Sequence, residues 1–280
     1  MNTQRLTLNC LGKLLVLDQP IVMGILNVTP DSFFDGGQYQ HIAEIVGRAS
    51  QMITDGATIL DIGGLSTRPG SAPVSPNEEM ERVVPAIKAI KDKFPEAIIS
   101  IDTYRAAVAR AAVEAGASII NDVSGGEMDD QMFDLVATLK TPYILMHMQG
   151  TPDQMQKDPH YENVTLDIMR SLVKRVGRLR ALGVKDIILD PGFGFGKTLA
   201  HNFQLLKELH TFQILDLPIL AGISRKSMIC RTLGVSPAEA LNGTTALHMV
   251  ALQQGAKILR VHDVKEAMEV ITLFQALEQA

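Results

Sequence analysis

Short apolar runs alternate with longer amphipathic stretches eight times along the chain. Several runs are apolar at almost every position, as expected of parallel strands that are covered on both faces. Eight strand-and-helix repeats predict a closed (β/α)8 TIM barrel, and they favour it over the alternative, a doubly wound open sheet. The predicted strands are residues 21–28, 58–62, 97–101, 118–123, 142–148, 186–189, 218–223 and 257–261.

The stretches between the strands have helical periodicity. Residues 76–94 predict a helix whose buried stripe is formed by Met80, Val83, Val84, Ile87, Ala89 and Ile90. Three stretches run into Gly-Ala, at Gly56, Gly116 and Gly255. A glycine just past a helix end supplies the left-handed position that closes the helix. The recurrence therefore indicates repeated helix-to-strand units.

Residues 5–18 form a different pattern, two short strands around Leu11-Gly12-Lys13. This pattern predicts a β-hairpin that covers the N-terminal end of the barrel. There is no linker or low-complexity tract between the repeats, and a barrel of this kind folds as one unit at about 250 residues. Residues 1–280 are therefore predicted to form a single domain.

Composition and charge narrow the class of protein. Apolar residues make up 46% of the chain and charged residues 20%, which is ordinary globular composition. Two cysteines are too few for a disulfide framework, so we expect a protein of the reducing cytoplasm. The N-terminal stretch lacks a basic leader and no apolar run reaches the ~18 residues of a membrane helix. A net charge of −5 gives no support for a nucleic-acid or membrane partner.

Candidate chemistry lies where the strands end, because a parallel barrel places its active site at the C-terminal ends of its strands. One group consists of amides and carboxylates: Asn27, Asp102, Asn121, Asp122 and Asp190. The other group is cationic and follows the last two strands: Arg225, Lys226, Arg260 and His262, with Ser224 beside them. Alternation along a strand directs Arg260 and His262 to one face, and barrels often bind phosphate at these two strands. A phosphorylated or diphosphorylated substrate is predicted, although each cation taken singly is as well explained as a surface charge.

A glycine-rich loop, residues 190–197, follows the sixth strand. Its backbone permits close approach of a flat ligand, and Phe193 and Phe195 offer faces for stacking. The loop matches neither a P-loop nor a dinucleotide-binding loop, since Pro191 and Lys197 stand where those motifs need glycine. The histidines lack zinc-site spacing, and His147 is interpreted as structural.

Four segments resemble signatures of the dihydropteroate synthase family, and the likeness covers essentially the whole chain. They are residues 24–33, 189–197, 224–227 and 260–263. The family joins 6-hydroxymethyl-7,8-dihydropterin diphosphate to p-aminobenzoate, releasing pyrophosphate in folate biosynthesis. The resemblance implies a transferase that uses Mg²⁺, forms no covalent enzyme intermediate and is a homodimer. It also implies that sulfonamides are inhibitors.

The resemblance assigns roles to individual residues. It implies that Asp102, Asn121, Asp190 and Lys226 bind the pterin, with Phe195 in the adjoining loop. It implies that Asn27, Arg260 and His262 hold the diphosphate and its metal, with Asn27 as the metal ligand. Lys226, Arg260 and His262 are the expected leaving-group stabilisers. Thr67, Arg68, Pro69 and Ser224 are expected around p-aminobenzoate and the reacting carbon.

The chain departs from the family pattern in three loops, at Leu65, where Glu is usual, at Phe34 and at Tyr104-Arg105. These departures are expected to affect p-aminobenzoate affinity and sulfonamide sensitivity more than the reaction. Two other functions remain open at this stage. One is a pterin-dependent methyltransferase, which has no need of a diphosphate site, and the other is a catalytically silent pterin-binding paralogue.

Overall fold

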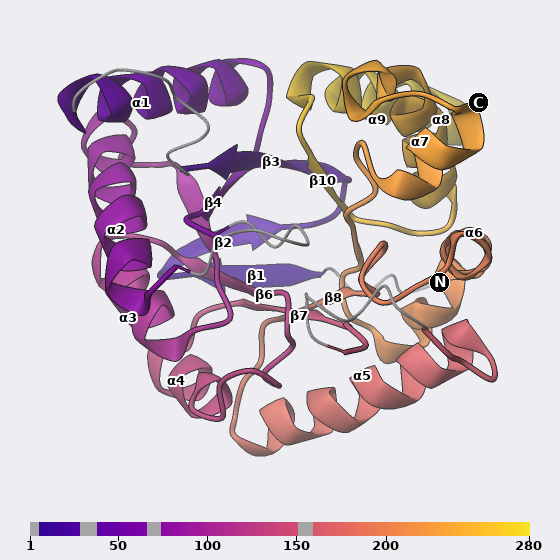
Figure 1. The fold of residues 1–280 in the computed structure, drawn as a ribbon, viewed down its shortest axis with the longest axis horizontal. Helices are drawn as coiled ribbons and strands as arrows, with labels where there is room; N and C mark the ends of the chain where they lie inside the picture. Colours follow the sequence, from indigo (N-terminus) through magenta and orange to yellow (C-terminus); the bar gives the residue numbers. More distant parts are fainter. Residues whose placement is uncertain (1–5, 29–37, 66–73, 151–158) are drawn as a thin grey trace.

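A computed structural model describes residues 6–28, 38–65, 74–150 and 159–280. Within these ranges a ring of parallel strands is surrounded by helices (Figure 1). The parallel strands are β3 (Ile21–Asn27), β4 (Ile59–Gly63), β5 (Ile98–Asp102), β6 (Ile119–Asp122), β7 (Tyr143–Met146), β8 (Ile187–Asp190), β9 (Leu220–Ala221) and β10 (Ile258–Val261).

The strands follow one another around the barrel in the order β8-β7-β6-β5-β4-β3-β10-β9, and each neighbouring pair is parallel. A single bridge between Leu189 and Ile219 joins the two ends of this sheet, where the Leu189 N–H donates to the Pro218 carbonyl at 2.8 Å. The predicted TIM barrel is therefore confirmed. The seventh strand is shorter than predicted, because regular pairing with β10 covers only Leu220 and Ala221.

The helices of the described ranges form the outer layer. They are α1 (Gln38–Thr54), α2 (Pro76–Lys93), α3 (Ala106–Glu114), α4 (Met132–Leu139), α5 (Val164–Ala181), α6 (Leu199–Lys207), α7 (Ser227–Leu233), α8 (Leu241–Gln253) and α9 (Val264–Glu278), with 3-10 turns at Leu209–Leu215 and Pro237–Glu239. None of them combines the length and apolarity that crossing a membrane requires.

The predicted helix ends are confirmed. A capping box between Ser75 and Glu78 starts α2, and the Phe94 N–H closes it on the Ile90 carbonyl. Gly56, Gly116 and Gly255 all have positive φ, from +93° to +119°, in the turns that lead into β4, β6 and β10. These left-handed positions let each chain segment reverse directly into the next strand.

Side chains that point into the barrel form successive levels, because alternate residues of a strand share a face. The first level lies at the N-terminal ends of the strands and is entirely apolar. Each parallel strand contributes one residue to it: Met23, Ile59, Ile98, Ile119, Ile144, Ile188, Leu220 and Ile258. The residues of opposite parity, such as Leu60, Ile101 and Val261, pack outward in the larger cluster that the helices cover.

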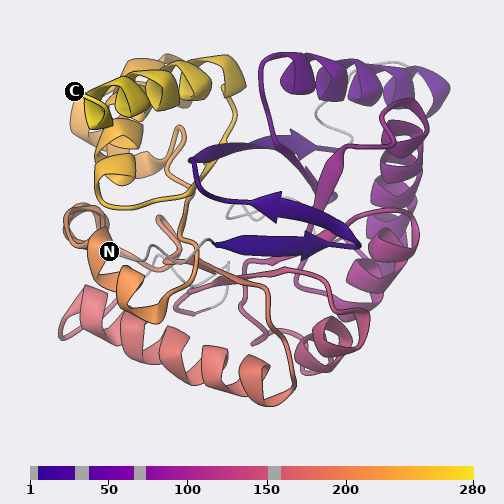
Figure 2. The same ribbon diagram turned by 180° about the vertical axis from the view of Figure 1, so that it is seen from behind.

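The predicted hairpin consists of β1 (Thr7–Cys10) and β2 (Lys13–Val16), joined at Leu11 and Gly12, which both have positive φ. It lies across one end of the barrel (Figure 2). Leu8, Cys10 and Leu17 are buried against the first level, so the hairpin closes the N-terminal end as predicted.

Leu8→Ala is expected to lower the free energy of unfolding by about 2–4 kcal/mol, because Leu8 is 1% exposed and its loss leaves a cavity between the hairpin and the first level. Urea denaturation followed by circular dichroism measures the change. Leu14, on the same hairpin but 64% exposed, is the control, and Leu14→Ala is expected to change the value by less than about 0.5 kcal/mol. Equal effects from the two substitutions would contradict the assigned burial.

Candidate active site

The next two inward levels carry the polar side chains, at the C-terminal ends of the strands. Two residues beyond the first level, the second level consists of Ile25, Asp61, Ser100, Asn121, Met146, Asp190, Gly222 and Arg260. Two residues further on, the third level includes Asn27, Gly63, Asp102, Val123, Met148, Ser224 and His262. The strand geometry therefore brings most of the predicted site residues to one end of the barrel.

Arg260 lies between two carboxylates from different strands. Its Nε donates to Asp61 Oδ2 and its Nη2 to Asp102 Oδ2, both at 2.6 Å. The same Asp61 oxygen accepts from Asn121 Nδ2 at 3.0 Å. Arg260 and Asp102 each keep 18% of their side-chain surface exposed, whereas Asp61 is completely covered. The cluster thus presents Arg260 and Asp102 at the barrel mouth and holds them from beneath.

Burial and charge act against each other in this cluster. Burial, opposed by Arg260 and reinforced by the carboxylate of Asp61, raises the pKa of Asp102 to about 7. Burial disfavours the charge of Arg260, but Asp61 and Asp102 outweigh it and raise the pKa of the guanidinium above its usual value. Two carboxylates therefore share one permanent cation, and Asp102 is the group whose charge changes near neutral pH.

Asp190 and Lys226 form the second polar pair of the mouth. Asp190 is 6% exposed, and its Oδ1 accepts the Gly192 N–H at 2.8 Å. Burial raises its pKa, with the positive charge of Lys226 opposing the change. The Lys226 ammonium donates to the Phe193 carbonyl and lies 4.5 Å from the centre of the Phe195 ring. Burial lowers the pKa of Lys226 to about 8, although Asp190 counteracts it.

The glycine-rich loop is held in shape by Lys197, which is 3% exposed. Its ammonium donates to the carbonyls of Gly192 and Phe195 at 2.8 and 3.0 Å and lies 3.2 Å from His147 Nδ1. Gly192 has φ +74°, and a Cβ there would lie 1.9 Å from the His147 carbonyl oxygen. Lys197 and His147 therefore support the loop from inside the protein, which matches the structural interpretation of His147.

One side of the mouth is apolar. Val123, Met146 and Met148 form a small buried cluster, and Tyr104 and Phe195 pack against it. Phe195 adjoins Lys226 through the ring contact described above. Apolar surface next to a few convergent polar groups is typical of a site for a flat heterocycle.

The remaining predicted residues occupy the rim of this end. Ser224 Oγ lies 3.0 Å from His262 Nδ1 and also accepts the His262 backbone N–H at 3.2 Å, while His262 itself is exposed. Asn27 is exposed at the end of β3, and its Oδ1 and Asp102 Oδ2 both lie against Gly63. Thr67, Arg68, Pro69 and Phe34 lie outside the described residues.

Two of the polar residues that the sequence placed at strand ends, Asp122 and Arg225, bind partners away from the barrel mouth. Asp122 has the outward parity and accepts from Tyr143 OH, Ser124 Oγ and two backbone amides. Arg225 forms a two-pronged ion pair with Asp263, at 2.8 Å on each prong, and also donates to two carbonyls at Pro237–Glu239. The cationic group at the mouth is therefore smaller than the sequence indicated, because Arg225 ties α7 to the start of α9.

Tyr104-Arg105, one of the positions that differ from the family pattern, makes defined contacts in the structure. Arg105 donates to Glu79 Oε2 and to the Val74 carbonyl, both at 2.7 Å, and its guanidinium stacks on Tyr104 at 5.1 Å. Burial raises the pKa of Glu79, with hydrogen bonding from Thr103 and the charge of Arg105 opposing the change. The guanidinium is thereby bound to α2 and to the Val74 carbonyl.

Asp61 is the site residue that sequence reasoning missed. It interrupts the apolar run Ile59-Leu60-Asp61-Ile62 and stands two residues after the first-level Ile59. Its parity alone directs it into the barrel, where a carboxylate needs a partner. That signal was present in the sequence, but it did not indicate which cation would meet it.

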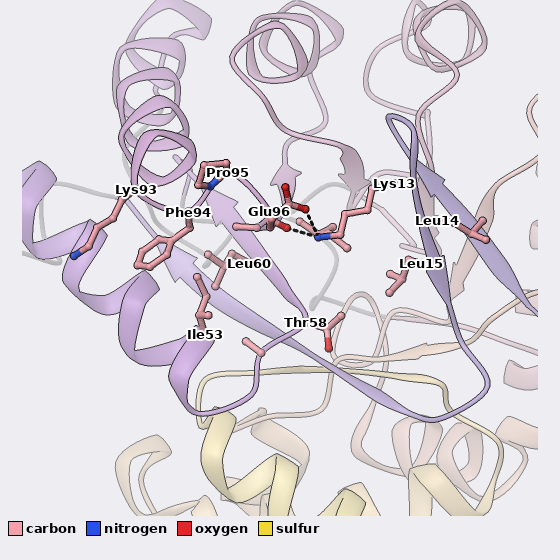
Figure 3. Close-up of a pocket in the computed structure, with 13 residues that line it drawn as sticks. Lys13, Leu14, Leu15, Ile53, Thr58, Leu60, Lys93, Phe94, Pro95 and Glu96 are labelled. Carbon is pink, nitrogen blue, oxygen red and sulfur yellow. Dashed lines mark hydrogen bonds and ion pairs between the residues drawn. The ribbon is translucent and has the colours of Figure 1, made fainter.

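A separate pocket lies at the other end of the molecule, beside the hairpin (Figure 3). Its volume is about 480 Å³, and its walls are mainly apolar side chains such as Leu15, Ile53 and Phe94. At its rim the Lys13 ammonium donates to the Glu96 carbonyl and contacts the Glu96 carboxylate at 3.1 Å. None of the predicted site residues line it, so it is distinct from the polar mouth.

Comparisons with known proteins agree with this geometry. Residues 23–262 match the model of the family described as pterin binding enzyme. Dihydropteroate synthase of Escherichia coli K12 is 46% identical over 267 residues, covering 95% of this chain and 94% of that protein. The structure of Xanthomonas albilineans dihydropteroate synthase with 4-aminobenzoic acid is 41% identical (TM-score 0.92) and covers 99% of this chain and 100% of that one. The Yersinia pestis enzyme with a sulfonamide drug is 44% identical (TM-score 0.91), with the same coverage. The chain belongs to the pterin-binding enzyme family, among its dihydropteroate synthases.

Proposed function

We propose that the protein condenses (7,8-dihydropterin-6-yl)methyl diphosphate with p-aminobenzoate, giving 7,8-dihydropteroate and pyrophosphate in folate biosynthesis. The observation that supports this most directly is the convergence of Asp102, Asn121 and Asp190 with Lys226 and Arg260 at one barrel mouth. Hydrogen-bond acceptors and cations lie there within reach of a single ligand.

The carboxylate side of the mouth suits the edge of a pterin ring. That edge carries an amino group and ring N–H donors, and Asp190, Asp102 and the amide of Asn121 are matching partners. Phe195 and the methionines next to it supply a surface for the ring face. We assign pterin binding to these residues and to Lys226, whose ammonium lies over the Phe195 ring.

The cationic side suits a departing pyrophosphate. Arg260, Lys226 and His262 are expected to stabilise the negative charge that builds on the leaving group, which is the preorganised electrostatic contribution that often dominates catalysis. The reaction is proposed to be dissociative: the C–O bond to diphosphate breaks first, the pterin delocalises the resulting carbocation, and the arylamine nitrogen then attacks it and releases a proton. No covalent bond to the protein is needed.

A magnesium ion fits this site as a partner of the substrate. Among the described residues, no group of three or more His, Cys, Asp or Glu side chains is placed to hold a metal. Mg²⁺ commonly keeps several waters and is held by few protein ligands together with substrate phosphates, and the side-chain oxygen of Asn27, an exposed residue at the end of β3, would be one such ligand. When bound, the ion would neutralise diphosphate charge.

Pyrophosphate release tests the proposed function. The protein is incubated with pterin diphosphate and Mg²⁺, with and without p-aminobenzoate, and pyrophosphate is measured. Release that depends on the arylamine is expected. A methyltransferase or a silent pterin-binding paralogue would release none under either condition, and that result would exclude the proposed reaction.

The pH dependence of kcat/KM for pterin diphosphate is expected to be bell-shaped, with its maximum between about pH 7 and 8. The raised pKa of Asp102, about 7, means that its carboxylate forms only above that pH. The lowered pKa of Lys226, about 8, means that its ammonium is lost above that pH. Lys226→Arg is expected to remove the alkaline limb, because guanidinium does not titrate there. A flat profile from pH 6 to 9 would contradict both assignments.

We further propose that the protein is a cytoplasmic homodimer and that sulfonamides compete with p-aminobenzoate for it. The basis for the dimer is the family likeness alone, and sedimentation equilibrium tests it. Thr67, Arg68, Pro69 and Ser224 are proposed to surround p-aminobenzoate. Inhibition kinetics with a sulfonamide, varied against p-aminobenzoate, test the second statement, and competitive inhibition is expected.

A further inference from the structure

We infer that Asp61 is a positioning residue of this site, which acts through Arg260 and Asn121 rather than by touching the substrate. The inference rests on the proposed function, since it concerns how that site holds its guanidinium and amide. It starts from a contrast between two buried aspartates of the same barrel, one with its side chain directed inward and one with its side chain directed outward.

Asp61 makes its hydrogen bonds to site residues. It is 1% exposed on the second inward level, below Asp102 on the third. Its Oδ2 accepts from Arg260 Nε at 2.6 Å and from Asn121 Nδ2 at 3.0 Å. Within the described residues its Oδ1 makes no hydrogen bond. The carboxylate is therefore connected to the protein through two side chains that face the mouth.

Asp122, the last residue of β6, shows what a purely structural buried aspartate looks like. It is 0% exposed, and it accepts the Ser124 and Gly126 amides, the Ser124 hydroxyl and the Tyr143 hydroxyl. Those donors tie β6 to its own loop and to β7. Asp61 has no backbone donor of this kind in the described residues. A role in connecting one part of the backbone to another therefore does not account for its charge.

The contacts explain what Asp61 contributes. Asp102 is the other carboxylate that Arg260 contacts, and Asp102 is also needed to accept hydrogen bonds from the pterin. With Asp61 present, Arg260 is anchored from below, and its positive charge is shared between Asp61 and Asp102. Without that anchor the guanidinium would pair with Asp102 alone, and Asn121 would lose the acceptor that fixes its amide orientation. The Arg260 guanidinium and the Asn121 amide would then be less well positioned to bind the substrate.

The test is a double-mutant cycle on kcat/KM for pterin diphosphate, using Asp61→Asn, Arg260→Met and the double variant. Asp61→Asn alone is expected to lower kcat/KM by roughly 10- to 150-fold, the range for loss of a charged hydrogen bond. In the Arg260→Met background the same substitution is expected to cost less than about threefold, because its main partner is gone. Fully additive losses would overturn the inference.

The pH profile supplies a readout that a structural role would leave unchanged. The charge of Asp61 raises the pKa of Asp102, so Asp61→Asn is expected to move the acid limb to lower pH. Asp122→Asn is the matched control: it is expected to lower stability in urea and to move the acid limb less than Asp61→Asn does, because the charge of Asp122 raises the pKa of Asp102 less than the charge of Asp61 does. An acid limb that stays at the same pH in Asp61→Asn would count against the proposal that Asp61 acts on the site through this cluster.

The experiments distinguish failure of this inference from failure of the proposed function. A wild-type protein that releases no pyrophosphate disproves the proposed function, whereas an active wild type with an unaffected Asp61→Asn disproves only this inference. If Asp61→Asn does not fold, Asp61→Ser leaves room for formate. Formate-dependent recovery of kcat/KM in that variant supports the inference, and a folded variant that formate does not rescue overturns it.

Discussion

Asp190→Asn is expected to lower kcat/KM for pterin diphosphate by roughly thirtyfold to a few thousandfold, which corresponds to about 2–5 kcal/mol for a buried charge pair that loses one partner. The substitution removes the carboxylate proposed to accept the pterin N–H groups. It also removes the negative charge that opposes the effect of burial on the pKa of Lys226. Steady-state kinetics with varied pterin diphosphate measure the effect.

Asp122→Asn provides the comparison, because Asp122 is equally buried at a strand end but faces away from the mouth. It is expected to lower stability by about 1–3 kcal/mol through its lost hydrogen bonds and to leave kcat/KM within about threefold of wild type. If Asp122→Asn were as damaging to kcat/KM as Asp190→Asn, the effect would reflect general disruption of the barrel. The assignment of Asp190 to pterin binding would then fail.

Arg260→Met is expected to have two effects. The free energy of unfolding falls by about 3–5 kcal/mol, because Asp61 and Asp102 are left as uncompensated carboxylates. Binding of the diphosphate substrate weakens by about 1.5–3 kcal/mol, the range for a charge-assisted hydrogen bond. Urea denaturation measures the first quantity, and calorimetric titration with pterin diphosphate measures the second.

The stability loss in Arg260→Met is also expected to depend on pH. Without the guanidinium, the positive charge that opposes the effect of burial on the pKa of Asp102 is lost, so the folded-state pKa of Asp102 rises further above its unfolded value. The folded state then binds more protons than the unfolded state, so stability is restored as the pH falls and Asp102 is protonated. A loss that grows toward acid pH would have the wrong sign and would contradict the ion-pair geometry.

Arg225→Met is the matched control, since Arg225 also pairs with a carboxylate at the end of the barrel that carries the site. Its partner is Asp263, and both side chains are about one-fifth exposed (21% and 20%), so the substitution should lower stability without changing diphosphate affinity. A drop in affinity equal to that of Arg260→Met would show that the two arginines act alike. The distinction drawn from their contacts would then be wrong.

Much of the fold was predictable from local sequence pattern. The eight apolar runs, the glycines at helix ends and the turn at Leu11-Gly12 each depend on residues near one another in the chain. Alternation along a strand also predicted that Arg260 and His262 share a face. Even Asp61, although it was missed, carried a readable signal in its parity with Ile59.

The partners of the charged residues were not predictable in the same way. Arg260 and Asp61 are 199 positions apart, and barrel closure and strand register bring them within 2.6 Å. Arg225 and Lys226 are adjacent in sequence, yet one is bound to Asp263 and the other lies over Phe195. Local pattern fixes which face a side chain occupies, because it follows from backbone periodicity. Which opposite charge meets it is decided only when distant strands pair, because ion pairing depends on distance in space and is indifferent to distance along the chain.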